Sequence, residues 1–171
     1  HKFFGIKGIA CLIKKEKINL SPLIAGGDSQ TIYRAGTPSV PLIASLAKAL
    51  RLILTEQEEN TKKVQELNNY LRENLTNLNV IINSPVDASP YILNFSIIGK
   101  KPETVLHTFE LFDIYISSKT ACSSKEIYSQ TLYALTNNME ISKSSLRVSF
   151  SKDNTKEEID TFIKVLKEEI L

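Results

Sequence analysis

A first candidate for a reactive side chain is Cys122, which lies in the segment SSKTACSSKE. Its neighbours are small or hydroxyl-bearing residues rather than the apolar residues that surround a core thiol. Lys119 and Lys125 flank it three positions to either side, and nearby ammonium groups favour the nucleophilic thiolate. Free cysteines are often buried and inert, so the residues alone leave both a nucleophile and a structural thiol open.

Two basic residues lie in settings that suit specific chemistry. Lys2 follows a histidine and precedes two aromatic residues and a glycine, where partial desolvation would favour the neutral amine used in Schiff-base chemistry. A solvated lysine near a terminus is the alternative. Arg147 lies in the alternating segment SLRVSF, where an arginine is either exposed at a sheet edge or binds a carboxylate with its planar fork.

The remaining cysteine and the histidine in the middle of the chain give weaker signals. Cys11 is surrounded by apolar residues on a predicted strand and is expected in the core. His107 lies in a helical segment without a second histidine or cysteine at ligand spacing, so we expect no metal site. So few cysteines in 171 residues do not indicate a disulfide-stapled secreted domain, and we expect a reduced, cytoplasmic protein.

The composition argues against several kinds of partner. The net charge is +2 and the charged residues are interspersed, so neither nucleic acid nor an anionic membrane is an expected partner. No stretch approaches the roughly 20 apolar residues that span a bilayer, and we expect a soluble protein. The sequence opens at His1 inside an amphipathic phrase, from which we expect that the beginning of the protein is missing.

The first part of the chain is predicted to hold two short strands, a long loop and a long helix. The strands are expected over residues 8–13 and 18–20, on either side of the charged turn KKEK. Residues 21–38 carry glycines and prolines typical of a loop, and their apolar residues favour a binding role over disorder. From Val40 onward, apolar residues at three-and-four spacing predict one long helix, or two in series, to about Leu78.

The second part of the chain, residues 79–171, is predicted to alternate strands and helices in the order ββαβαβα. The strands are expected at 80–82, 91–98, 114–117 and 146–150, and the second of them is expected to be central. The helices are expected at 103–112 and 127–135, with a last helix that begins at Thr155. Thr155 and Glu158 have the spacing of a capping box. This order predicts a two-layer α/β sandwich.

Four segments, taken in order, resemble motifs of the class V aminotransferase family and, within it, of the cysteine desulfurases. HKFFGIKG resembles HK-x-x-G-P-K-G, whose lysine carries pyridoxal phosphate and whose histidine lies near the cofactor phosphate. The resemblance assigns these roles to Lys2 and His1, with Ile6 in place of the usual proline. GGDSQTIYRAGTPS resembles the GG…R-x-GT loop, whose threonine, here Thr37, reaches the cofactor phosphate of the partner subunit.

The other two motifs lie in the second half of the chain. SSKTACSS resembles the SSGSAC-[ST]-S loop that bears the catalytic cysteine, here Cys122, although Lys119 and Thr120 replace the common glycine and serine. SSLRVSFS is similar to SS-[IL]-R-[FI]-S, whose arginine, here Arg147, binds the substrate carboxylate. The spacing between the cysteine and the arginine resembles that of desulfurases with a long mobile cysteine loop, so residues 117–125 are expected to form a mobile loop.

The resemblance implies an α/β fold and a division of the chain into three parts. Residues 1–38 would be the end of the large domain that binds pyridoxal phosphate, residues 39–78 the connecting helix or helices, and residues 79–171 the small C-terminal domain. Because the family's other cofactor contacts lie upstream, this chain by itself is expected to bind the cofactor weakly and to catalyse poorly.

The resemblance also implies a reaction and partners. A homodimer would remove sulfur from L-cysteine with pyridoxal phosphate, give L-alanine and a persulfide on Cys122, and pass the sulfur to an acceptor protein in iron–sulfur cluster assembly or a thiolation pathway. Another pyridoxal-phosphate enzyme of class V, or an inactive fragment for dimerisation or interaction, is the alternative.

Overall fold

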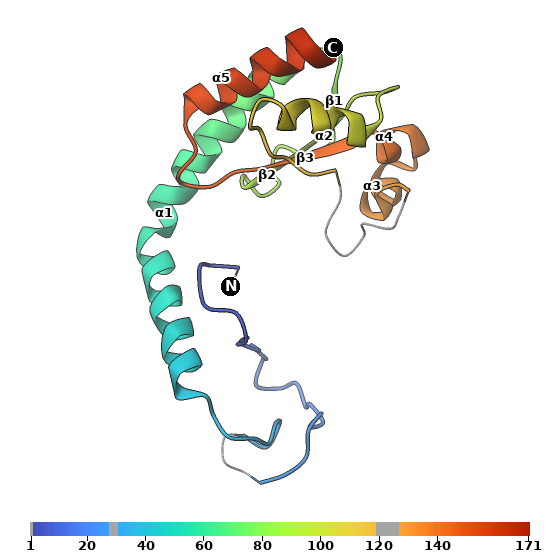
Figure 1. The fold of residues 1–171 in the computed structure, drawn as a ribbon. Coiled ribbons are helices and arrows are strands. Elements are labelled where there is room, and N and C mark those ends of the chain that lie inside the picture. Colours follow the sequence, from blue (N-terminus) through green and yellow to red (C-terminus); the bar gives the residue numbers. More distant parts are fainter. Residues whose placement is uncertain (1, 28–30, 119–126) are drawn as a thin grey trace. The chain divides into compact units, whose positions relative to one another are not determined.

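The structure is a computed structural model that describes residues 2–27, 31–118 and 127–171 (Figure 1). The chain divides into two compact units, His1–Gln57 and Glu58–Leu171, and each is described by itself. Two of the predicted site residues, His1 and Cys122, lie outside the described residues, as does most of the loop predicted to be mobile. The three-part domain division proposed from the sequence stays a prediction.

The two strands predicted near the start of the chain are absent from the described residues of the N-terminal unit. The chain turns at the charged segment, where the Ile18 amide donates to the Lys15 carbonyl at 3.0 Å. Apolar composition alone does not make a strand, because its backbone needs a paired neighbour, and no described segment pairs here. Leu12 and Ile13 are therefore 78% and 90% exposed, and Cys11, predicted in the core, is exposed as well.

The long loop predicted before the first helix is confirmed for its described residues. It folds back on itself through an isolated bridge between Ile24 and Arg34, and the Ala35 amide donates to the Ile24 carbonyl at 3.0 Å. Gly26 permits this close approach, because a Cβ atom there would lie 2.7 Å from that of Ala35. The loop then reaches Gly36, whose φ of +133° lies in the region that favours glycine.

Helix α1 is a single helix over Val40–Thr76, which confirms the long-helix prediction. In the part that belongs to the second unit, apolar side chains at three-and-four spacing are buried: Val64, Leu67, Leu71 and Leu75. This stripe forms one wall of the core of that unit. In the part of α1 that belongs to the N-terminal unit, leucines such as Leu52 and Leu54 are exposed.

A small antiparallel sheet forms the centre of the second unit. Its strands β1 (Ile81–Ile82), β2 (Ile92–Ser96) and β3 (Ser145–Ser149) lie in the order β1-β2-β3, so β2 is central as predicted. The strand predicted at 114–117 appears only as an isolated bridge from Ser117 to Arg147. This bridge lies on the side of β3 away from β2.

The helices around the sheet agree with the sequence pattern in type and order. They are α2 (Pro102–Glu110), α3 (Gln130–Thr136), α4 (Met139–Lys143) and α5 (Lys156–Val165), and a π-helical turn over Leu166–Ile170 follows α5. Helix α4 was not predicted. Its signal is the pair Asn137 and Asn138: the first ends α3 with φ of 49°, and the second caps α4 by accepting from the Glu140 and Ile141 amides.

One aromatic cluster joins the helices to the sheet. Phe162 of α5 stacks on Phe109 of α2 with ring centroids 4.7 Å apart, and it meets Phe95 of β2 edge-on at 6.3 Å. Helix α5 also runs beside the C-terminal half of α1 (Figure 1), where the Tyr70 hydroxyl donates to Asp160 Oδ1 at 2.6 Å. These contacts give the predicted two-layer arrangement, in which α1, α2 and α5 pack on the apolar face of the sheet.

Arg72 of α1 fixes the loop that leads into β2. Its Nε donates to Asn68 Oδ1 at 2.8 Å, and its terminal nitrogens donate to the Ser84 and Pro85 carbonyls at 2.8 and 2.9 Å. The Asn68 amide donates in turn to the Pro90 carbonyl at 2.8 Å. All the nitrogens of this guanidinium therefore have protein acceptors. Among the described residues, no helix is long and apolar enough to cross a membrane.

We expect Phe162→Ala to lower the free energy of unfolding by about 3–5 kcal/mol, because it removes a buried ring that contacts both layers. Urea denaturation followed by circular dichroism measures this change. The control is Phe112→Ala, which truncates a ring that is 44% exposed and should cost less than about 1.5 kcal/mol. Equal losses in the two variants would contradict the assigned core.

The capping box of α5 predicts a pH dependence of stability. Hydrogen bonds from the Asn154 side chain and the Thr155 amide lower the pKa of Glu158. The stabilisation by this carboxylate is thus present above its ordinary pKa and is lost as the pH falls through the lowered value. We expect Glu158→Gln to lower the melting temperature at pH 7 and to have a progressively smaller effect as the pH falls below about 4.3, the ordinary glutamate pKa.

Candidate active site

Arg147 of β3 is the best-defined candidate for binding a ligand in the described chain. Its side chain is half-buried, and its Nε atom is buried without a hydrogen-bond partner. Among the described residues, no carboxylate forms an ion pair with it. A buried donor without an acceptor costs about 1–3 kcal/mol, and a bound carboxylate would supply the missing acceptor. Of the two readings left open by the sequence, the geometry favours carboxylate binding over simple edge exposure.

Alternation along the strands places Arg147 on the polar face of the sheet. Leu146 and Val148 point into the core, so Arg147 between them points to the other face. Its cross-strand partner on β2 is Asn94. Two residues further along β2, Ser96 pairs with Ser145, and both are buried.

Burial on this polar face changes along the strands. At one end helix α4 covers the sheet, and the Ser96 hydroxyl donates to the Ile141 carbonyl at 2.8 Å. At the other end Ile92 and its partner Ser149 are exposed. Asn94 and Arg147 lie between these ends and are half-buried. A ligand could therefore reach them while the protein still shields part of their surface from water.

Asn94 and its neighbours were not among the residues predicted for the site. The Asn83 amide donates to Asn94 Oδ1 at 2.7 Å and to the Ser96 hydroxyl at 2.8 Å. The available signal was the alternation in LNFSI, where Asn94 and Ser96 interrupt an otherwise apolar strand. Such polar residues in a central strand mark the face that is turned away from the core.

Lys2, the predicted cofactor anchor, belongs to the N-terminal unit and is exposed. It lies in a turn that includes Phe4, two residues further on, whose φ of 65° is uncommon for a bulky residue. The same segment passes along the start of α1, because Cβ atoms at Gly5 and Gly8 would lie 3.7 Å from Ala49 and Leu42.

Thr37, the predicted phosphate ligand, follows Gly36 at the end of the folded-back loop and is exposed. The donor set of the N-terminal unit thus offers an accessible amine and an accessible hydroxyl. These are groups that suit the aldehyde and the phosphate of pyridoxal phosphate. Arg147 belongs to the second unit, and Cys122 and His1 lie outside the described residues.

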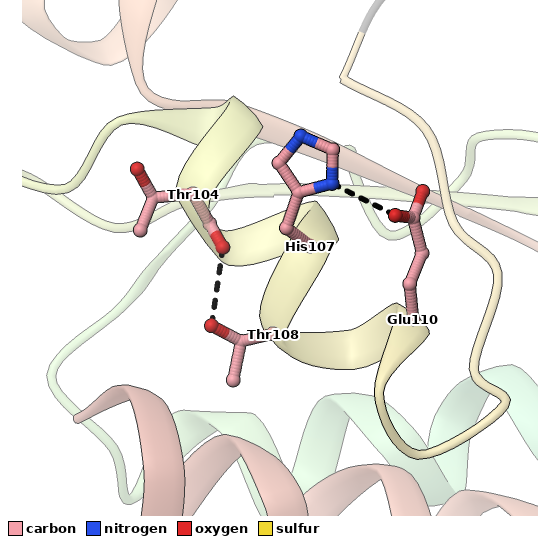
Figure 2. Close-up of polar contacts among 4 residues, drawn as sticks. All are labelled: Thr104, His107, Thr108 and Glu110. Atoms are coloured by element: carbon pink, nitrogen blue, oxygen red, sulfur yellow. Dashed lines mark hydrogen bonds and ion pairs between the residues drawn. The ribbon is translucent and has the colours of Figure 1, made fainter.

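His107 is an exposed helix residue that pairs with a nearby carboxylate. Figure 2 shows it on α2, where its Nδ1 is 2.8 Å from Glu110 Oε2, one helical turn away, and where the Thr108 hydroxyl donates to the Thr104 carbonyl. In the part of the chain that the structure describes, no cluster of three or more histidine, cysteine or acidic side chains could hold a metal ion.

A cleft of about 340 Å³ in the second unit is a competing location for a ligand. Apolar residues of β3 and α5 form its floor, with Asp113 and Glu158 among its polar residues and no lysine or arginine. An anionic substrate would find no cationic partner there. The chemistry therefore favours the polar face at Arg147.

The fold and the polar face define an α/β unit in which the Nε atom of Arg147 lacks an acceptor and suits an anionic ligand. A family model, aminotransferase class-V, matches residues 1–162. The chain belongs to the class V aminotransferase family. It is 40% identical over 167 residues to the NifS/IcsS protein homolog of Lactobacillus delbrueckii, covering 95% of this chain and 43% of that protein.

Further relatives carry the same names. A cysteine desulfurase IscS of Clostridium botulinum is 33% identical over 172 residues, covering 97% of this chain and 43% of that protein. A solved NifS-like protein superposes with a TM-score of 0.82 at 30% identity, covering 98% of this chain and 43% of that one. The NifS-like protein of Rickettsia africae gives 0.73 at 28% identity, over 88% and 40% of the two chains. This chain therefore spans less than half of these relatives and matches their C-terminal part.

The unpaired Nε atom leads to a prediction about stability. Arg147→Met removes a buried donor that has no acceptor, so we expect the free energy of unfolding to stay unchanged or to rise by up to about 1 kcal/mol. The matched control is Arg72→Met, which removes a guanidinium with three acceptors and should cost about 2–3 kcal/mol. Urea unfolding of both variants tests this. A loss at Arg147 as large as that at Arg72 would mean that Arg147 has a structural acceptor.

Proposed function

We propose that the complete protein is a pyridoxal-phosphate-dependent cysteine desulfurase that converts L-cysteine into L-alanine and a persulfide on Cys122. The observation that carries the proposal is the half-buried Arg147, whose Nε lacks an acceptor on the polar face of the sheet. An amino-acid carboxylate would provide this acceptor as a charge-assisted bond. The desulfurase relatives that span almost all of this chain support the choice of amino acid.

Residues of the N-terminal unit would hold the cofactor. The exposed amine of Lys2 would bind the aldehyde carbon of pyridoxal phosphate, and His1 would lie near the cofactor phosphate. The Thr37 hydroxyl would donate to the phosphate of the cofactor that the partner subunit holds. When bound, pyridoxal phosphate supplies an electron sink for the bonds around the substrate α-carbon. The displaced Lys2 amine would carry the proton between carbon atoms of the substrate.

Residues of the second unit would bind the substrate and accept its sulfur. Arg147 would hold the carboxylate and so fix the direction of the carbon–sulfur bond. The Cys122 thiolate would attack the substrate sulfur and form a sulfur–sulfur bond. The carbon–sulfur bond then breaks, its electron pair stays with carbon, and that carbon is protonated to give L-alanine.

The same proposal includes partners and a location. The N-terminal unit exposes large apolar side chains, among them Ile13 and Leu23 at 90% and 93%, and exposure of this extent is typical of surfaces that other protein segments cover. A homodimer would cover part of them. The persulfide would pass to an acceptor protein for iron–sulfur cluster assembly or thiolation. A cytoplasmic location fits a protein with few cysteines that uses a reduced thiol.

Two substitutions in the complete protein test the function. We expect Cys122→Ser to reduce alanine and sulfide production to background while the cofactor absorbance stays, because only the sulfur acceptor is lost. Lys2→Ala should abolish the reaction and shift the absorbance, because the cofactor loses its covalent anchor. Full activity of Cys122→Ser would overturn the desulfurase assignment in favour of another class V reaction.

A further inference from the structure

Asn94 lies beside Arg147 on the neighbouring strand. The backbone nitrogen and carbonyl of Arg147 both bond to Ser117, on the side of β3 away from β2. Asn94 and Arg147 are therefore a non-hydrogen-bonded pair of the β2–β3 ladder, in which the Cα atoms of opposite residues are only about 4.5 Å apart. Both side chains project from the half-open polar face.

The orientation of the Asn94 amide follows from a chain of hydrogen bonds that begins at helix α4. The Ile141 carbonyl can only accept, so the Ser96 hydroxyl must donate its proton there. Ser96 then has only lone pairs left for Asn83, which must present its NH₂ group. The same NH₂ group faces Asn94 at 2.7 Å, so Asn94 must present its oxygen. The network thereby settles an assignment that atomic positions alone leave ambiguous.

This orientation turns the Asn94 NH₂ group toward Arg147. Asn83 directly follows β1, and its backbone nitrogen donates to the backbone carbonyl of Asn94 at 2.8 Å. Asn83 therefore lies on the β1 side of β2. Arg147 lies on the β3 side. Since Asn94 Oδ1 points to β1, its Nδ2 points to β3. Among the described residues, no acceptor is assigned to this Nδ2.

We propose that Asn94 Nδ2 is a second ligand of the carboxylate that Arg147 binds, and that Asn83 is a positioning residue that orients it. This inference rests on the proposed function and adds a specificity-determining residue to it. The two side chains offer only donors toward the open face. Such an arrangement suits a planar group with two acceptor oxygens and gives no bonds to a substrate that lacks the carboxylate.

The experiment uses the complete protein loaded with its cofactor and compares L-cysteine with cysteamine, which has the amine and the thiol but no carboxylate. A hydrogen bond to a charged group is worth about 1.5 kcal/mol, so Asn94→Ala should raise KM for L-cysteine about tenfold. The carboxylate does not react, so kcat should stay within about threefold. The inhibition constant of cysteamine should not change.

Two further variants separate binding from folding. Asn94→Asp keeps the acceptor for Asn83 and the size of the side chain but replaces the donor with a negative charge, so KM should rise more than in Asn94→Ala. Asn83→Asp should turn the Asn94 oxygen toward the substrate and raise KM by a similar factor. In an Asn94→Ala background the same change should add little, because its effect acts through Asn94.

The matched control is Asn74→Ala, which truncates a half-buried asparagine whose side-chain amide donates to the Tyr70 backbone carbonyl, one turn back on its own helix. Its KM should equal that of the unmodified protein. A raised KM for Arg147→Ala with an unchanged KM for Asn94→Ala and Asn94→Asp would overturn this inference alone. An unchanged KM for Arg147→Ala would overturn the proposed function with it.

Discussion

The register between β2 and β3 is the constraint on which the second unit depends. Side chains of a strand alternate between two faces, so the register that turns Leu93 and Phe95 inward also turns Asn94 outward. On β3 it does the same for Leu146 and Arg147. A slip of one residue would bring the guanidinium into the apolar core and the leucine onto the polar face. The core and the candidate site are thus fixed by one pairing, and the stacked phenylalanines that hold α2 and α5 on the sheet stabilise both.

The two half-buried arginines of this unit show how stability and function are divided. Arg72 has an acceptor for each of its nitrogens and ties the loop before β2 to α1. Arg147 has a buried nitrogen with no acceptor. Native proteins satisfy nearly all of their buried donors, so this exception on a partly open face supports the proposed ligand role of Arg147. The hydrogen bonds from Ile141 through Ser96 and Asn83 to Asn94 orient the polar side chains of that face.

The N-terminal unit is held together by different contacts. Its loop is held by short local contacts, such as the bridge between Ile24 and Arg34, while several of its large apolar residues are exposed. Helix α1 belongs to both units and is buried along one stripe only in its C-terminal half. The same apolar spacing is therefore fully buried in one half of the helix and only partly buried in the other.

The sequence by itself determined the local elements of this protein. Periodicity gave the long helix, the central strand and the last helix with its capping box, because spacing and capping act within a few residues. The ordered motifs around Lys2, Thr37, Cys122 and Arg147 indicated the family, to which the chain belongs. Only the tertiary structure decided where partners exist. In the structure Cys11 is exposed, and the two strands predicted near it do not form among the described residues. The strand predicted at 114–117 is a single bridge, and Asn94 pairs with Arg147 across two strands. These outcomes depend on contacts between residues far apart in the chain, which local patterns do not specify.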